Sequence, residues 1–147
     1  MSKTKLVLIM YLFLILETFS CRSINEFYVY LVENVDEVKI TFEFANFKEN
    51  RTIKKSLIIN QKDDIVNICK IIGDTKKPNL ACGYNCYIHY YSLGKIVMSL
   101  KINLKADYIA FSKGIKSYRT NISKEGNVLL DNYRKEIIND LGPEWED

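Results

Sequence analysis

Three cysteines and the single histidine lie close together in the middle of the chain, and both residue types bind soft metal ions. They are Cys69, Cys82, Cys86 and His89. The spacing Cys82-x3-Cys86-x2-His89 matches no strong zinc signature, which would combine paired C-x2-4-C and H-x3-5-H units. We therefore predict that the protein binds neither a metal ion nor a cofactor.

The first residues of the chain have the three-part layout of a secretory signal peptide. A basic start with Lys3 and Lys5 precedes the apolar run 6–16, and a short, more polar stretch ends at Ser20. The apolar run is shorter than the ~20 residues that a membrane-spanning helix requires. We predict export, with residues 1–20 as the signal peptide and residues 21–147 as a single domain.

Cys21 directly follows this stretch, and the segment resembles the lipobox of bacterial lipoproteins. In that motif a small residue, here Ser20, precedes the cysteine that becomes the acylated N-terminus. Thr18 replaces the usual leucine, and Glu17 adds a charge that the motif normally lacks. We predict that Cys21 carries acyl chains such as palmitate, which would anchor the protein stably in a bilayer. The alternative is a soluble secreted protein.

The remaining cysteines are candidates for a disulfide, because disulfides form in exported proteins. With Cys21 acylated, three thiols remain, so one disulfide and one free cysteine are expected. Cys69 would pair with Cys82 or with Cys86, and the sequence leaves both pairings open. Without acylation four cysteines are available, and two disulfides become the simpler expectation.

His89 has the chemistry of a general base, but the sequence shows no serine or cysteine nucleophile paired with it. The chain also lacks a phosphate-binding glycine loop, a G-x-S-x-G motif and an H-E-x-x-H motif. We therefore predict a non-enzymatic protein without catalytic residues. The alternative from another class is a hydrolase or metal-binding protein that uses Cys82, Cys86 and His89.

Tyrosines are the feature that most suggests molecular recognition. Strand alternation would place Tyr87, His89 and Tyr91 on one face, opposite Ile88 and Tyr90. Tyrosine is enriched at protein interfaces, yet it also simply favours strands. The segment is therefore either an interaction patch or an ordinary strand. Nucleic-acid binding is not expected, because 21 basic and 18 acidic residues give a net charge of only +3, without a basic block.

The apolar patterns predict seven strands and two helices. Strands are expected at 27–32, 38–44, 52–59, 87–92, 96–104, 108–111 and 115–119. Asn60 would cap a helix that ends at Gly73, and Ser123 would cap a last helix that ends at Gly142. The segment 74–86 is expected to be a loop, and residues 144–147 form a short acidic tail whose Trp145 could dock.

The order β-β-β-α-β-β-β-β-α, with short connections, predicts an α+β fold. Its sheet should be mostly antiparallel, with both helices packed on one face.

Several short motifs resemble small, mostly uncharacterised lipoproteins of Bacteroidota-type bacteria. They are LII at 57–59, DI at 64–65, YYSLGK at 90–95, GIKSY at 114–118 and LL at 129–130. The resemblance covers roughly residues 50–138, and some of these lipoproteins are similar to immunity proteins, which neutralise toxins. It implies an envelope location and a binding function. We predict a non-enzymatic lipoprotein, facing the periplasm or the cell surface, that binds a protein or ligand.

Overall fold

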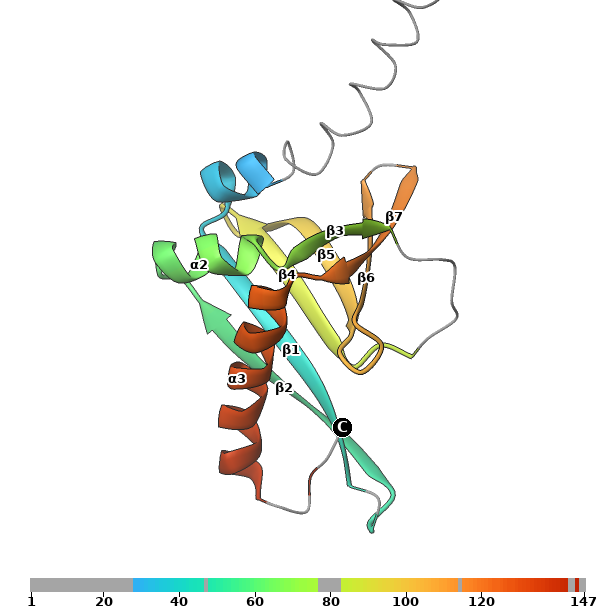
Figure 1. Cartoon of the computed structure of the whole chain (residues 1–147). Helices are drawn as coiled ribbons and strands as arrows, with labels where there is room; N and C mark the ends of the chain where they lie inside the picture. Colours follow the sequence, from blue (N-terminus) through green and yellow to red (C-terminus); the bar gives the residue numbers. More distant parts are fainter. Residues whose placement is uncertain (1–27, 47, 77–82, 114, 143–144, 146–147) are drawn as a thin grey trace, which may run out of the picture.

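The computed structural model describes residues 28–46, 48–76, 83–113, 115–142 and 145, and it confirms an α+β fold built on an antiparallel sheet (Figure 1). Three helical segments accompany the sheet in these ranges: residues 28–34, α2 (Lys62–Cys69) and α3 (Lys124–Leu141). The predicted signal peptide, Cys21 and Cys82 lie outside the described residues.

Seven described strands form one sheet in the order β2-β1-β4-β5-β6-β7-β3, and every neighbouring pair is antiparallel. The strands are β1 (Glu37–Asn46), β2 (Arg51–Ile59), β3 (Ile72–Lys76), β4 (Cys86–Ser92), β5 (Lys95–Asn103), β6 (Tyr108–Lys113) and β7 (Lys116–Ile122). Strands β4 to β7 follow one another as hairpins, whereas the β1–β4 and β7–β3 pairs join segments far apart in the chain.

The first predicted strand, at 27–32, is wrong, because residues 28–34 are helical. Aromatic and β-branched residues favour a strand here. However, Leu31 and Val35 are four residues apart and both are buried, while Val29 and Tyr30 are about half exposed. With this helical spacing, one side of the segment packs against the core. Tertiary packing therefore overrides the intrinsic preference of these residues for a strand.

The predicted end of α2 and the loop at 74–86 are also partly wrong. The helix buries Ile65, Ile68 and Cys69 as expected, but it ends at Cys69, and its N-cap is Gln61 rather than Asn60. Residues Ile72–Lys76 then form β3, which pairs with β7. Gly73 therefore lies in a strand, where a Cβ atom would come within 2.5 Å of the Asn121 side chain. The observed order is α-β-β-α-β-β-β-β-β-α.

The core lies between one face of the sheet and the helices. Val38, Ile40, Phe42 and Phe44 alternate along β1 and are all buried, as the sequence predicts. Helices α2 and α3 cover this face in Figure 1, and they contribute residues such as Leu130 to the same core.

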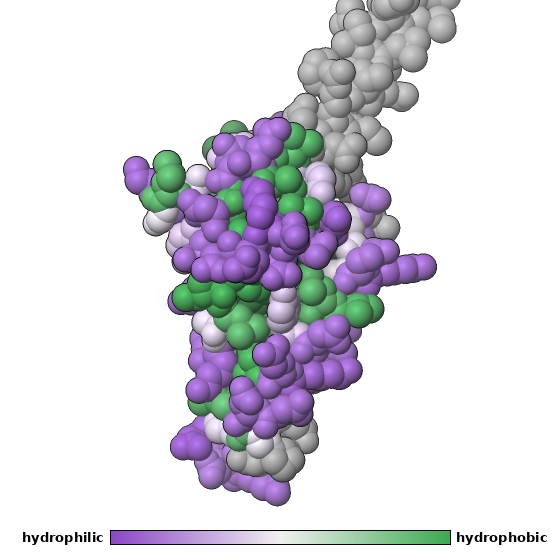
Figure 2. All heavy atoms as spheres, turned by 90° about the vertical axis from the view of Figure 1, so that its left-hand side faces the viewer, coloured by the Kyte–Doolittle hydropathy of each residue, from purple (hydrophilic) through white to green (hydrophobic). Residues whose placement is uncertain are grey.

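The last helix has the ends that the sequence predicts. The Ser123 Oγ accepts a hydrogen bond from the Gly126 amide at 3.0 Å, and the helix stops before Gly142. Beyond it Trp145 is buried, with the Arg51 guanidinium 5.6 Å from the centre of its ring. Seen from the α2 side, the surface is largely hydrophilic with apolar residues between (Figure 2).

Candidate binding site on the open sheet face

The sheet face that is turned away from α2 and α3 is covered by no described helix, and we call it the open face. One row of side chains crosses six strands on this face through successive cross-strand partners: Ser56, Thr41, Tyr87, Lys101, Ala110 and Arg119. A second row contains Ile58, Lys39, His89 and Ser99. The open face therefore combines hydroxyl, aromatic and charged groups on a rigid sheet, and β1 adds the carboxylates of Glu37 and Glu43 to the cations.

The predicted patch of Tyr87, His89 and Tyr91 lies on the open face. All three side chains are partly exposed, while the intervening Ile88 and Tyr90 are fully buried on the helix side. Strand alternation was therefore sufficient to place these residues. Their role in binding stays a prediction.

His89 is hydrogen-bonded to Ser99, a partner that the sequence did not reveal. The two residues are opposite one another on β4 and β5, and 2.7 Å separates His89 Nδ1 from Ser99 Oγ. The sequence could have indicated this pair through the two-residue turn at Leu93 and Gly94, because residues at equal distances from a turn lie opposite one another in a hairpin. However, β5 carries one extra residue between the Tyr91–Ile96 and Tyr90–Met98 partners, which shifts a simple count by one.

A serine–histidine pair can be a nucleophile and its general base when a third group orients the histidine. Among the described residues, the hydrogen-bond partner of the His89 side chain is Ser99. The β1 glutamates on this face are Glu37 and Glu43, and the Glu43 carboxylate lies 3.2 Å from the Lys54 amine. The pair therefore offers a ligand a hydroxyl group and an imidazole nitrogen held in fixed positions.

Amines lie over tyrosine rings on this face. The Lys54 Nζ is 5.2 Å from the centre of the Tyr87 ring, and the Lys101 Nζ is 6.0 Å from that of Tyr84. The Tyr87 hydroxyl donates to the Tyr84 carbonyl oxygen at 3.3 Å, and the Tyr84 ring packs beside Tyr108. Cation–π attraction favours these positions, so positive charge is held next to aromatic surface.

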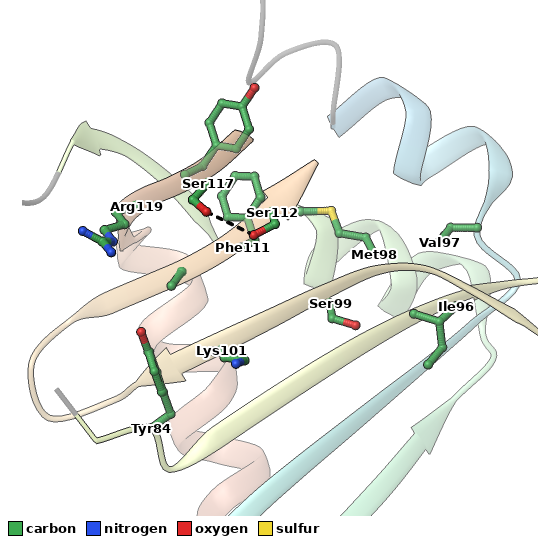
Figure 3. A pocket seen from close by; sticks show the side chains of 12 residues that line it. Tyr84, Ile96, Val97, Met98, Ser99, Lys101, Phe111, Ser112, Ser117 and Arg119 are labelled. Carbon is green, nitrogen blue, oxygen red and sulfur yellow. Dashed lines mark hydrogen bonds between the residues drawn. The ribbon is translucent and has the colours of Figure 1, made fainter. Parts of the chain in front are cut away.

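A cleft of about 500 Å³ opens between β5 and the β6–β7 hairpin (Figure 3). Its lining residues are Tyr84, Ile96, Val97, Met98, Ser99, Lys101, Ala110, Phe111, Ser112, Ser117, Tyr118 and Arg119. Among these described residues are two cations, Lys101 and Arg119, and no carboxylate. Sequence reasoning missed this cleft, because it depends on how the hairpin diverges from β5.

The divergence begins where β5 is irregular. Strands β5 and β6 are paired from Asn103 and Tyr108 to Leu100 and Phe111, and the described residues form no pair beyond. The register shift opposite Tyr90 and Tyr91 lies just past this point on β5. Because a bulge bends a strand and increases its twist, it accounts for the departure of β5 from its neighbour.

The thiols lie on the other side of the sheet. Cys69 and Cys86 are both buried and free, so the structure contains no bond between them. Burial raises the pKa of Cys69 to about 11 and raises that of Cys86 further. A disulfide between Cys69 and Cys82 stays a prediction, because Cys82 is outside the described residues.

A site shared by Cys86 and His89 is not compatible with the strand geometry. Cys86 is fully buried on the helix side of β4, whereas His89 is on the open face. Within the described ranges, no group of three or more His, Cys, Asp or Glu side chains is placed to hold a metal ion. The helices in those ranges are also too short or too polar to cross a membrane.

Comparisons of the chain with protein-family models, with curated proteins and with solved structures found no match.

Proposed function

We propose that the protein is a non-enzymatic lipoprotein of the bacterial cell envelope whose open face binds an acidic surface of a partner protein. The observation that carries this proposal is the row through Thr41, Tyr87, Lys101 and Arg119, in which tyrosine and cations share a sheet face that no described helix covers. Tyrosine and arginine are the residues most enriched at interfaces and among those that dominate binding energy. The cations select an acidic partner through charge complementarity.

The N-terminal pattern supports the location. The basic, apolar and small-residue layout before Cys21 is that of an exported protein, and acylation of Cys21 would anchor it. The first described helix begins at Tyr28, so the chain can place it at most about 25 Å from the acylated residue, at ~3.6 Å per residue. The partner would therefore be met close to the membrane surface.

An immunity-type inhibitor is the specific form of this function that the sequence resemblance suggests. Such a protein would occupy a toxin that reaches the envelope, and charge attraction would speed the encounter. A rigid antiparallel sheet suits this task, because side chains that are already ordered lose little entropy when they bind.

Site-specific photo-cross-linking in the native envelope tests the binding function. A photoreactive residue in place of Tyr87 should give a discrete adduct with an acidic protein. The same residue in place of Val128, which is exposed on α3, is the matched control and should give none. Equal adducts from both positions, or none from either, would refute the proposal.

Mass spectrometry of the mature N-terminus tests the anchor. We expect a chain that begins at Cys21 and carries acyl groups. An unmodified chain, or one that begins elsewhere, would support the soluble secreted alternative instead.

A hydrolase is the second candidate function, and the hydrogen bond between His89 and Ser99 is the observation that favours it. A fluorophosphonate probe, which labels activated serines, distinguishes the two functions. A binding protein leaves Ser99 unlabelled, whereas stoichiometric labelling that is lost in both Ser99→Ala and His89→Ala would establish the hydrolase.

A further inference from the structure

Within the part of the chain that the structure describes, strand β5 has a free edge inside the cleft. Its Ile96, Met98 and Ser99 pair with β4 on one side, with Val97 as the extra residue between them, but β6 pairs with β5 only from Leu100 onward. No described strand therefore occupies the other edge of this segment. An unpaired strand edge presents backbone N–H and C=O groups to any chain that can lie alongside it.

We propose that this cleft binds an extended, acidic segment of the partner protein, which adds to the free edge of β5 as a further strand. The inference rests on the proposed function and specifies how the partner is held. In strand addition, backbone hydrogen bonds supply affinity, and pockets for alternate side chains supply specificity. At ~3.3 Å per residue, the segment 96–99 can pair with about four residues of the partner.

The two sides of the cleft differ in polarity. On the helix side, Met98 and Phe111 are almost fully buried, and the Phe111 ring stacks on Tyr118 with 5.1 Å between the ring centres. The open-face side carries hydroxyl groups and cations, on Ser99, Ser112, Ser117, Lys101 and Arg119 (Figure 3).

This division matches a strand whose side chains alternate between apolar and acidic. Successive residues of a strand point to opposite faces, so one set would contact Met98 and Phe111 while the other meets Lys101 and Arg119. A guanidinium can bind a carboxylate through two parallel hydrogen bonds, which makes Arg119 the stronger of the two charged contacts. No carboxylate among the described lining residues opposes this attraction.

Nuclear magnetic resonance of the mature chain with a synthetic peptide tests the inference. The probe is acetyl-(Val-Glu)4-amide, and the readout is the exchange rate of those backbone amides in 96–99 that point to the free edge, because alternate N–H groups of a strand point to opposite edges. We expect saturable binding that slows exchange of these amides at least about tenfold and shifts the resonances of Phe111 and Ser112. The same peptide with lysine in place of glutamate should not bind.

Three further probes separate the inference from its competitors. A peptide methylated on alternate backbone nitrogens should fail to protect residues 96–99, since it cannot form the ladder. Free glutamate or inorganic phosphate that produces the full effect would show a small-anion site and overturn the inference. Protection that appears on concentrating the protein alone would show that a second copy occupies the edge, and would also overturn it.

A variant that fills the cleft provides an independent check. Ser112→Trp should weaken peptide binding at least about tenfold, while Val128→Trp, at an exposed position of α3 outside the cleft, should leave it within about twofold. Equal binding by both variants would contradict the inference. If cross-linking from Tyr87 succeeds and every peptide fails, strand addition is wrong and the proposed function stands.

Discussion

His89 and Ser99 face one another across β4 and β5, with 2.7 Å between the imidazole Nδ1 and the serine Oγ. The pair lies beside Tyr87 and Lys101, which are partners in the next row of the same two strands. Ser99 also lines the cleft. The imidazole, the hydroxyl group and the cation therefore form one continuous polar area that joins the predicted tyrosine patch to the cleft.

Ser99→Ala should impair partner binding without a large loss of stability. A single intramolecular hydrogen bond contributes about 0.5–1.5 kcal/mol, so the free energy of unfolding should fall by no more than that. In Ser99→Ala, the yield of the adduct formed by a photoreactive residue at position 87 should decrease several-fold, because His89 loses the hydrogen bond that fixes its orientation on the binding face. Ser56→Ala is the matched control, because it removes a hydroxyl pair with Thr41 at the edge of the same face. An equal decrease in both variants would show that Ser99 has no special role.

When Cys69 is a free thiol, the free energy of unfolding should fall between pH 9 and pH 11. Burial raises the pKa of Cys69 from 9.0 to about 11, so the unfolded chain releases this proton at a lower pH than the folded chain. Stability from the neutral thiol is complete below pH 9 and is lost as the pH rises towards 11. We expect this group to account for about 1–2 kcal/mol of the decrease, measured by urea unfolding. The free energy of unfolding should decrease less steeply with pH in Cys69→Ala than in the native chain. An unchanged pH dependence would contradict this explanation.

Gly126→Ala should destabilise the protein, although alanine normally favours a helix. A Cβ atom at this position would lie 2.8 Å from the Ile71 Cα, so α3 could not stay in place against the chain that follows α2. Overpacking of this kind costs about 1–3 kcal/mol, which exceeds the ~1 kcal/mol gained in helix propensity. Chemical denaturation measures the difference. Val128→Ala, at an exposed position of the same helix, should be neutral or slightly stabilising.

Leu93→Asn should stabilise the protein. Leu93 has φ +49° in the turn between β4 and β5, a left-handed conformation that costs a leucine roughly 1–2 kcal/mol. Its side chain is 89% exposed, so little packing is lost on substitution. Asparagine tolerates this conformation, and the free energy of unfolding should rise by about 0.5–1 kcal/mol. A decrease would mean that the leucine side chain makes a contribution that the turn geometry does not explain.

The sequence predicted most elements whose burial follows a regular period. The alternation from Val38 to Phe44 placed β1 correctly, and Ser123 with Gly142 placed both ends of α3. The prediction from sequence was wrong for residues 28–34, where side chains that favour a strand also fit a helical spacing. It failed again for β3, a short strand containing Gly73 whose pairing with β7 joins distant segments.

The candidate site was predicted only in part. Period-two alternation is enough to put Tyr87, His89 and Tyr91 on one face of β4. The partner of His89 depends on the register between strands, which the extra residue in β5 alters. The cleft depends on where β6 leaves β5, a tertiary feature for which no local pattern was apparent.

The most direct test of the account compares photo-cross-linking from position 87 in two forms of the protein. One has the native cations, and the other has Lys101→Glu together with Arg119→Glu, which reverses two charges of the open face. We predict a discrete adduct with an acidic protein in the first form, reduced at least about tenfold in the second, because like charges across an interface oppose binding. Undiminished adduct in the reversed form would contradict recognition of an acidic partner by this face.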